Sequence, residues 1–454
     1  MRKGSCPQRD PIEHEIEVAL RPRTFIRDGE SFSFVSGLET VASRIEQLIE
    51  SDSKRACALY ETLLAGCTAK ANELDDSSGN FGQFAGDLIC EWIKARCAGD
   101  LDCDETAVML LGWMDDDPFA FFHDLEKPVV EAFDQSGLAA FERRVRSRFE
   151  ALLAVARVSG ALPGEQPEYR RRHWAAMLRA IYLRQKDREG YIALTDETAL
   201  TPEDCLALAK LDRETGRLGG ALAWVERGGE LCREDSRAWS ARLKLTKLQC
   251  DLLAAIGRTA EAAAIAWGEF ERHPSQYTYA DLLRFVAEPE RADWHGKAMN
   301  AARSADLHTM IDLLIAAQEI GRLADLITGT PDQALQDASH FATEPAAKAL
   351  EEPHPQLAAR LWRAQGMRIV EAGKSKYYDA ALENFEQAKR CYERAGLTVE
   401  WQRTVRIVSD RHFRKTGFIS GFRAVVSGTY NAEPPSFLER AKDNWRKRYG
   451  SPTS

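Results

Sequence analysis

The sequence lacks the cysteine spacing and the apolar runs that define several common classes of protein. Its 10 cysteines include no CxxC pair, so the spacing typical of a zinc ribbon or a redox-active dithiol is absent. No stretch approaches the roughly 18 uncharged apolar residues that a membrane-spanning helix needs. The first residues, Met1-Arg-Lys-Gly-Ser-Cys-Pro7, lack the apolar stretch of a signal peptide. We therefore expect a cytoplasmic protein with reduced thiols that does not contact a membrane.

Motifs for binding nucleotides and calcium are incomplete. Gly373-Lys-Ser375 resembles the end of a phosphate-binding loop, but the glycine required five positions earlier is Arg368. Asp100-Leu-Asp-Cys-Asp104 resembles the start of a calcium loop, but Glu105 and Leu111 occupy the positions that need Gly and Glu. No nucleophile elbow or catalytic triad is identifiable. The sequence therefore predicts no enzyme, no cofactor and no metal site.

The densest group of polar candidates is Asp115-Asp-Asp117, followed by His123 and Asp124. Three carboxylates and an imidazole are ligands for a divalent metal. Adjacent aspartates cannot all point at one ion without a special loop, so we favour an acidic turn that ends a helix above packed aromatic side chains. The enzyme hypothesis requires Asp115, Asp117 and His123 to converge in one pocket.

Charge is spread unevenly along the chain. The net charge of −9 argues against a protein that coats DNA with its whole surface. Residues 360–454 nevertheless contain 19 Lys and Arg against 10 Asp and Glu, an excess of nine positive charges. A basic end on an acidic body indicates a site for nucleic acid or an acidic partner. Solvated side chains that pair locally with glutamates are the simpler interpretation.

Basic residues concentrate in one expected helix near the carboxyl end, and Arg446-Lys-Arg448 adds a basic tail. The residues with which this helix would contact phosphate or an acidic partner are Arg403, Arg406, Arg411, Arg414 and Lys415. The alternative is that this segment closes the end of a repeat array, with Phe418 and Phe422 sealing its core.

Apolar side chains recur throughout with the spacing of amphipathic helices. In Tyr377-Tyr-Asp-Ala-Ala-Leu382 and the residues that follow, Tyr378, Ala381, Leu382 and Phe385 share one face. Small alanines at points of close approach are typical of the second helix of a tetratricopeptide-type repeat. Alternating strand patterns are absent, so the fold expected is all-α.

Turn and capping residues divide the expected helices into blocks. Ser36 and Glu39 predict a capping box at the start of the first long helix, and Thr201 before Pro202 predicts another helix start. Asp104 is the expected cap of a further helix, and Ser136-Gly137 separates two others. Gly-Arg pairs at 216–217, 257–258 and 321–322 recur as turns between paired helices. Thr330-Pro331 caps a helix in the manner of Thr201-Pro202.

Residues 160–167 are rich in glycine and proline, which break helices, and are the best candidate for a linker. We therefore expect a loosely ordered segment with a short helix over residues 1–35, a helical block over 36–158, a degenerate tetratricopeptide-like block over 169–430, and a basic tail over 431–454.

The ten tryptophans lie at helical spacings, which are typical of core positions. A tryptophan in a helical hairpin also lines a binding groove in some repeats. We assign Trp362 and Trp401 to such a groove.

Several segments together resemble an uncharacterised bacterial family of helical-repeat proteins, itself similar to the C-terminal helical region of bacterial SWIM zinc-finger proteins. The segments are Leu111–Pro118, Leu200–Leu206, Phe270–Ser275, Tyr377–Leu382 and Arg414–Phe422. The resemblance covers roughly residues 10–430. The SWIM motif itself, CxC followed by CxH, is absent, so no zinc-binding role follows from the resemblance.

These observations predict an all-α, tetratricopeptide-like array of helical hairpins, an α-solenoid in two helical blocks. The function expected is a non-enzymatic scaffold that binds a peptide or partner protein in a groove. The alternative is association with nucleic-acid phosphate through the basic C-terminal end.

Overall fold

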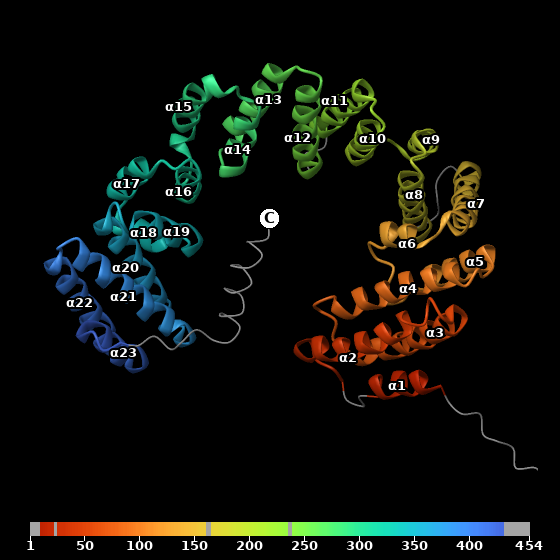
Figure 1. The fold of residues 1–454 in the computed structure, drawn as a ribbon, viewed down its shortest axis with the longest axis horizontal. Helices are drawn as coiled ribbons and strands as arrows, with labels where there is room; N and C mark the ends of the chain where they lie inside the picture. The colour runs from red at the N-terminus through yellow and green to blue at the C-terminus, as the bar shows by residue number, and fades with distance from the viewer. Residues whose placement is uncertain (1–9, 22–24, 160–164, 235–237, 431–454) are drawn as a thin grey trace, which may run out of the picture. The chain divides into compact units, whose positions relative to one another are not determined.

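The computed structural model describes residues 10–21, 25–159, 165–234 and 238–430. These residues form 23 α-helices and four short 3₁₀ helices and contain no strand (Figure 1). A single isolated bridge pairs Ile26 with Leu74. The expectation of an all-α fold is confirmed. No helix in this part of the chain has the length and apolar composition that crossing a membrane requires.

The chain folds as two compact units, Met1–Leu245 and Thr246–Ser454, called here unit 1 and unit 2. The division falls within α12 (Trp239–Ala255). The predicted linker at 160–167 does not coincide with it, and residues 160–164 lie outside the described ranges. The helices on either side of that segment belong to the same unit and pack against each other. The predicted tail at 431–454 also lies outside the described residues.

Unit 1 consists of helices that pack on their neighbours around one apolar core. They are α1 (Pro11–Ala19), α2 (Asp28–Glu46), α3 (Ser53–Lys70), α4 (Asn80–Ala98), α5 (Cys103–Asp115), α6 (Glu126–Ala132), α7 (Gln135–Ser159), α8 (Glu165–Gln185), α9 (Arg188–Thr198), α10 (Pro202–Glu214) and α11 (Leu218–Glu234).

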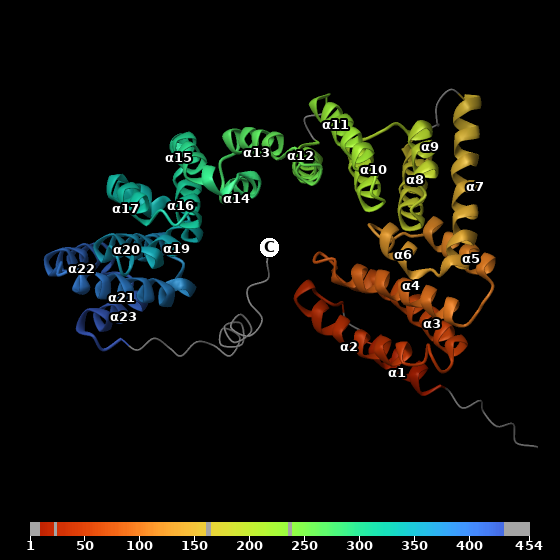
Figure 2. The same cartoon turned by 45° about the horizontal axis from the view of Figure 1, so that its top comes forward.

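Unit 2 contains the remaining helices and a second core rich in alanine and aromatic side chains. They are α13 (Thr259–Arg272), α14 (Gln276–Phe285), α15 (Arg291–Ala301), α16 (Leu307–Ala316), α17 (Ile320–Gly329), α18 (Asp332–Asp337), α19 (His340–Leu350), α20 (Pro355–Ala372), α21 (Tyr378–Arg394), α22 (Thr398–His412) and α23 (Thr416–Ser427). Figure 2 shows the helices of each unit from a second direction.

One type of turn joins five of the helix pairs. A residue in the left-handed conformation donates its N–H to the carbonyl three residues earlier, and the next N–H reaches the carbonyl five residues earlier. This is the hydrogen-bond pattern of the Schellman motif, and the next helix begins two residues after the left-handed one. The residues in the left-handed conformation are Lys186, Gly216, Gly257, Gln318 and Gly396. The expected helical hairpins are therefore present, at the unequal intervals of a degenerate repeat.

The predicted turns at 216–217 and 257–258 are confirmed, but the one at 321–322 is wrong. Gly321 lies inside α17, and Gln318 makes the turn three residues earlier with φ of 58°. Glycine tolerates this conformation best, so the turn was predicted at Gly321, which is the second residue of α17. Thr330 does not cap α18 in the manner of Thr201, because Pro331 itself is the residue before the helix.

Three predicted helix boundaries in unit 1 are also wrong. Ser36 lies within α2, which begins at Asp28, and Glu30 accepts a hydrogen bond from the backbone N–H of Arg27. Asp102, not Asp104, caps α5, because its carboxylate accepts from the N–H of Glu105 at 2.7 Å. The break between α6 and α7 lies at residues 133–134, before Ser136. The cap at Thr201 is confirmed as a capping box with Asp204.

Candidate functional site

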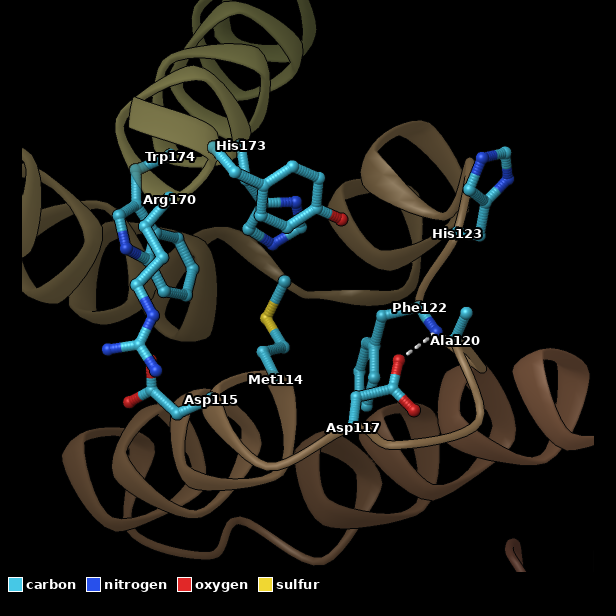
Figure 3. A pocket seen from close by; sticks show the side chains of 10 residues that line it. Met114, Asp115, Asp117, Ala120, Phe122, His123, Arg170, His173 and Trp174 are labelled. Carbon is cyan, nitrogen blue, oxygen red and sulfur yellow. Dashed lines mark hydrogen bonds between the residues drawn. The ribbon is translucent and has the colours of Figure 1, made fainter. Parts of the chain in front are cut away.

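The loop that follows α5 borders a cavity of about 460 Å³ in unit 1 (Figure 3). The end of α5 and this loop form one wall, and the first turns of α8 form another. The lining residues are Met114, Asp115, Asp117, Ala120, Phe122, His123, Tyr169, Arg170, His173 and Trp174. Aromatic, apolar and charged side chains thus meet in one hollow.

Asp117 fixes the conformation of the loop. Its two carboxylate oxygens accept hydrogen bonds from the backbone N–H groups of Phe121 and Phe122, each at 2.9 Å. Ala120, which directly precedes Phe121, adopts the left-handed conformation with φ of 55°. The carboxylate is therefore engaged in a local turn, and the two Phe side chains are directed into the core of unit 1.

Asp115 is engaged by a different partner. Its carboxylate forms an ion pair with Arg148 of α7, and the guanidinium of Arg148 lies over the ring of Trp174, 5.4 Å from the ring centroid. This cation–π contact and the ion pair connect α5, α7 and α8. Asp115 consequently serves to hold three helices around the cavity.

His123 lies at the edge of the cavity and its ring points away from it (Figure 3). Its side chain is 73% exposed, and its Nδ1 is 3.2 Å from the carboxylate of Asp124. Asp115, Asp117 and His123 therefore border one cavity without converging on a common point. Across the described residues, no three His, Cys, Asp or Glu side chains are placed to hold a metal ion. The three side chains thus line one cavity, and each has a different local partner.

His173 is the titratable group most enclosed by this cavity. Burial lowers its pKa, whereas Glu126, Asp115 and Asp117 raise it. Its ring stacks on Tyr169 at a centroid distance of 6.4 Å and meets Trp174 edge to face at 4.8 Å. A largely neutral imidazole between two aromatic rings provides a surface for a planar or apolar group.

Tyr169, His173 and Trp174 were not predicted as site residues. Tyr169 and His173 are four residues apart on one helix, a spacing that places both on the same face. That pair was the available signal in the sequence. The cavity additionally requires the loop after α5, which is more than 40 residues earlier in the chain.

A second hollow of about 280 Å³ borders the same loop. It shares Asp117 and Phe122 with the first cavity, and it is otherwise lined by residues of α3, α4, the end of α5 and the loop itself. These are Glu61, Leu64, Ala65, Thr68, Ile89, Trp113, Asp116, Pro118, Phe119 and Phe121. The loop that the sequence singled out thus separates two hollows in unit 1.

The predicted basic residues occupy two different environments in unit 2. Arg403 and Arg406 are exposed on α22. Arg411 is 3.9 Å from Glu371, and the guanidinium of Arg414 lies over the ring of Phe413. Lys415 donates a hydrogen bond to the carbonyl of Val370, in the last turn of α20, and therefore helps to end that helix.

Trp362 and Trp401 do not line a groove. Both belong to the core of unit 2, at 5% and 7% exposure. The indole N–H of Trp362 donates to Glu351 at 3.0 Å, and the ring of Trp401 lies 6.3 Å from that of Phe422. Helical spacing alone does not separate a core tryptophan from one in a groove, and the prediction that these two rings face a partner is corrected accordingly.

His412 predicts a pH dependence for the stability of unit 2. Its side chain is buried, and its Nε2 has no hydrogen-bond partner. Burial lowers its pKa, Lys415 and Arg411 lower it further, and Glu371 opposes them. Because the folded state then binds a proton less readily than the unfolded state, the stabilisation is complete above the ordinary pKa of about 6.5 and is lost as the pH falls below it.

We therefore expect the free energy of unfolding of the wild type to fall more steeply below pH 6.5 than that of His412→Gln, by up to about 1.4 kcal/mol per pH unit. Urea denaturation between pH 7.5 and 5.5 measures the two slopes. His173 is present in both proteins, so its contribution to the pH dependence is the same in the two slopes. Parallel pH profiles would contradict the assignment to His412.

Comparison with known proteins identifies a family. A solved structure entitled "Structure of Naa15/Naa10 bound to HypK-THB" matches 97% of this chain and 73% of that chain, with 15% identity and a TM-score of 0.35, a likeness too distant to bear on function. No curated protein matches. The model of a family described as "Family of unknown function (DUF6880)" matches residues 8–420. The chain, whose sequence already resembles an uncharacterised family of helical-repeat proteins, therefore belongs to this family of unknown function.

Proposed function

We propose that this protein is a non-enzymatic interaction scaffold that binds a segment of a partner protein in the cavity between α5 and α8. The observation that carries the proposal is the cavity of about 460 Å³ within a unit built of packed helix pairs. Helical-repeat folds commonly use hollows between successive helices to hold peptides.

The chemistry of the cavity suits a side chain of a partner peptide. Phe122, Trp174 and Met114 supply apolar walls, and Arg170 and His173 supply polar groups near them. A concave apolar surface with a few polar groups is the usual composition of a ligand pocket. Asp115 pairs with Arg148, and Asp117 accepts two backbone N–H groups. Both aspartates therefore have a structural role at the cavity.

Tyr169 is the side chain most suited to anchor a partner. It is 64% exposed at the rim of the cavity, and its ring is held against His173. Exposed tyrosines that pack against a partner are frequent sites of concentrated binding energy. Tyr277 on α14 provides a matched control, because it is 65% exposed and lies outside the cavity.

Selection of a displayed peptide library against the full chain tests the proposal. We expect the selected peptides to lose at least about tenfold in affinity for Tyr169→Ala, equivalent to about 1.4 kcal/mol. Their affinity for Tyr277→Ala should stay within about twofold of the wild type. Peptides that bind both variants equally well, or a library that yields no binder, would count against the cavity as the binding site.

A further inference from the structure

Three inter-helix turns lie next to one another at one end of unit 2. They are the turn before α19, the turn between α20 and α21, and the turn between α22 and α23. Arg368, near the end of α20, donates to the carbonyl of Ala338 at 2.8 Å, which joins the first turn to the second. Lys415 donates to the carbonyl of Val370, which joins the third turn to the second.

An aromatic side chain is exposed in or directly beside each of these turns. Phe341 is 72% exposed, Tyr377 is 47% exposed and Phe413 is 60% exposed. The backbone at Tyr377 is anchored by its neighbour Tyr378, whose ring meets the buried ring of Phe418 at a centroid distance of 5.6 Å. Exposed rings gathered on adjacent turns contribute nothing to the core of unit 2, so a binding role accounts for them better than a structural one.

The same turns are strongly basic. Residues 337–341, 368–378 and 411–416 contain six Lys or Arg side chains and two carboxylates, Asp337 and Glu371. The basic residues are Arg368, Lys374, Lys376, Arg411, Arg414 and Lys415. Asp337 is hydrogen-bonded by Gln333, and Glu371 by Gln336, with Arg411 beside it. The turns therefore carry an excess of four positive charges, which Asp379 and Asp410 directly beside them reduce to two.

Cations and rings are interleaved. The ammonium of Lys376 lies 4.8 Å from the ring centroid of Tyr377, and the guanidinium of Arg414 lies 5.3 Å from that of Phe413. The ring of His340 lies 4.0 Å from that of Phe341. Proteins that bind single strands combine a cationic track for phosphates with aromatic rings on which bases stack. A duplex presents no free base faces to such rings.

We propose that these three turns form a binding site for single-stranded nucleic acid, in which Phe341, Tyr377 and Phe413 stack on bases and the six cations contact phosphates. The site shares no residue with the cavity of unit 1, so its test is independent of the test of the scaffold function. Arg403 and Arg406 are also exposed, but they lie within α22 and outside the three turns.

Fluorescence anisotropy of a labelled 20-nucleotide oligothymidine with the full chain tests the proposal. We expect affinity to fall linearly with salt on logarithmic axes, as released counterions require. Phe341→Ala/Tyr377→Ala/Phe413→Ala should weaken binding at least tenfold. Lys374→Glu/Lys376→Glu/Arg414→Glu should weaken it by a similar or larger factor. Because all six side chains are exposed, we expect the variants to keep the circular dichroism and melting temperature of the wild type.

Arg403→Glu/Arg406→Glu is the control for general electrostatic attraction, and we expect it to change affinity less than about threefold. A duplex of the same length should compete poorly. The proposal is overturned if the aromatic variant binds as the wild type does. It is also overturned if oligoglutamate competes as well as oligothymidine, which would indicate an acidic protein partner at these turns. No binding at low salt would overturn it as well.

Discussion

Asp204→Ala is expected to lower the free energy of unfolding of unit 1 by about 3–5 kcal/mol, the usual cost of removing one partner from a buried ion pair. The Asp204 side chain is 2% exposed. Arg179 of α8 donates to both of its oxygens, at 2.6 and 3.2 Å, and the hydroxyl of Tyr191 on α9 donates at 2.8 Å. Thr201 completes the set through its N–H and its hydroxyl.

The loss is large because the substitution leaves several donors without an acceptor. The guanidinium of Arg179 and the hydroxyl of Tyr191 would stay partly buried after the carboxylate is removed, and neither has space to recover its full hydration. The same carboxylate also completes the capping box at the start of α10, because it accepts the backbone N–H of Thr201. One side chain thus joins α8, α9 and α10.

Urea denaturation measures this loss, with Asp196→Ala as the control because Asp196 is exposed on α9. The control should change the free energy of unfolding by less than about 0.5 kcal/mol. Burial raises the pKa of Asp204, but Arg179, Tyr191 and Thr201 together hold it below its ordinary value. The difference between wild type and variant should therefore be complete above about pH 4 and shrink in stronger acid. A loss below about 1 kcal/mol at pH 7 is incompatible with the network described.

Phe385→Ala is expected to destabilise unit 2 by about 3–5 kcal/mol, the range measured for truncating a buried phenylalanine. Phe385 is fully buried on α21. Its ring lies 5.0 Å from that of Phe422 and 6.0 Å from that of Phe418. A Cβ added at Gly366 of α20 would lie only 2.9 Å from this ring, so α20 approaches α21 closely at this point. The cavity left by the truncation would therefore open between three helices.

Phe341→Ala provides the matched control, because Phe341 is 72% exposed and its removal should cost less than about 0.5 kcal/mol. Thermal and urea unfolding of the full chain measure both variants. Equal losses for the two phenylalanines would contradict the placement of Phe385 at the centre of this core.

Phe385 could be predicted from sequence, whereas the partners of Asp204 could not. The period of 3.6 residues places Ala381, Leu382 and Phe385 on one face of a helix, and all three are buried. Local sequence also identified the helix start at Thr201, three residues before Asp204. Arg179 precedes it by 25 residues, and no local pattern shows that the two meet.

The candidate sites divide in the same way. The loop at 115–124 was identified by its density of carboxylates, but the cavity beside it exists because α8 supplies Tyr169, His173 and Trp174. The basic character of the C-terminal part was visible in composition. Its association with Phe341 and Tyr377 depends on contacts between residues that are 30 and 45 positions apart in sequence.

The helices, several of their turns and the faces that they bury follow from local sequence. They depend on spacing within one helix and on residues such as Gly216 that tolerate a left-handed backbone. The tertiary structure alone decided which tryptophans are core, which aspartates are engaged and which turns come together. Those outcomes depend on packing between helices distant in the chain, where burial and hydrogen-bond partners are set by neighbours that no local pattern specifies.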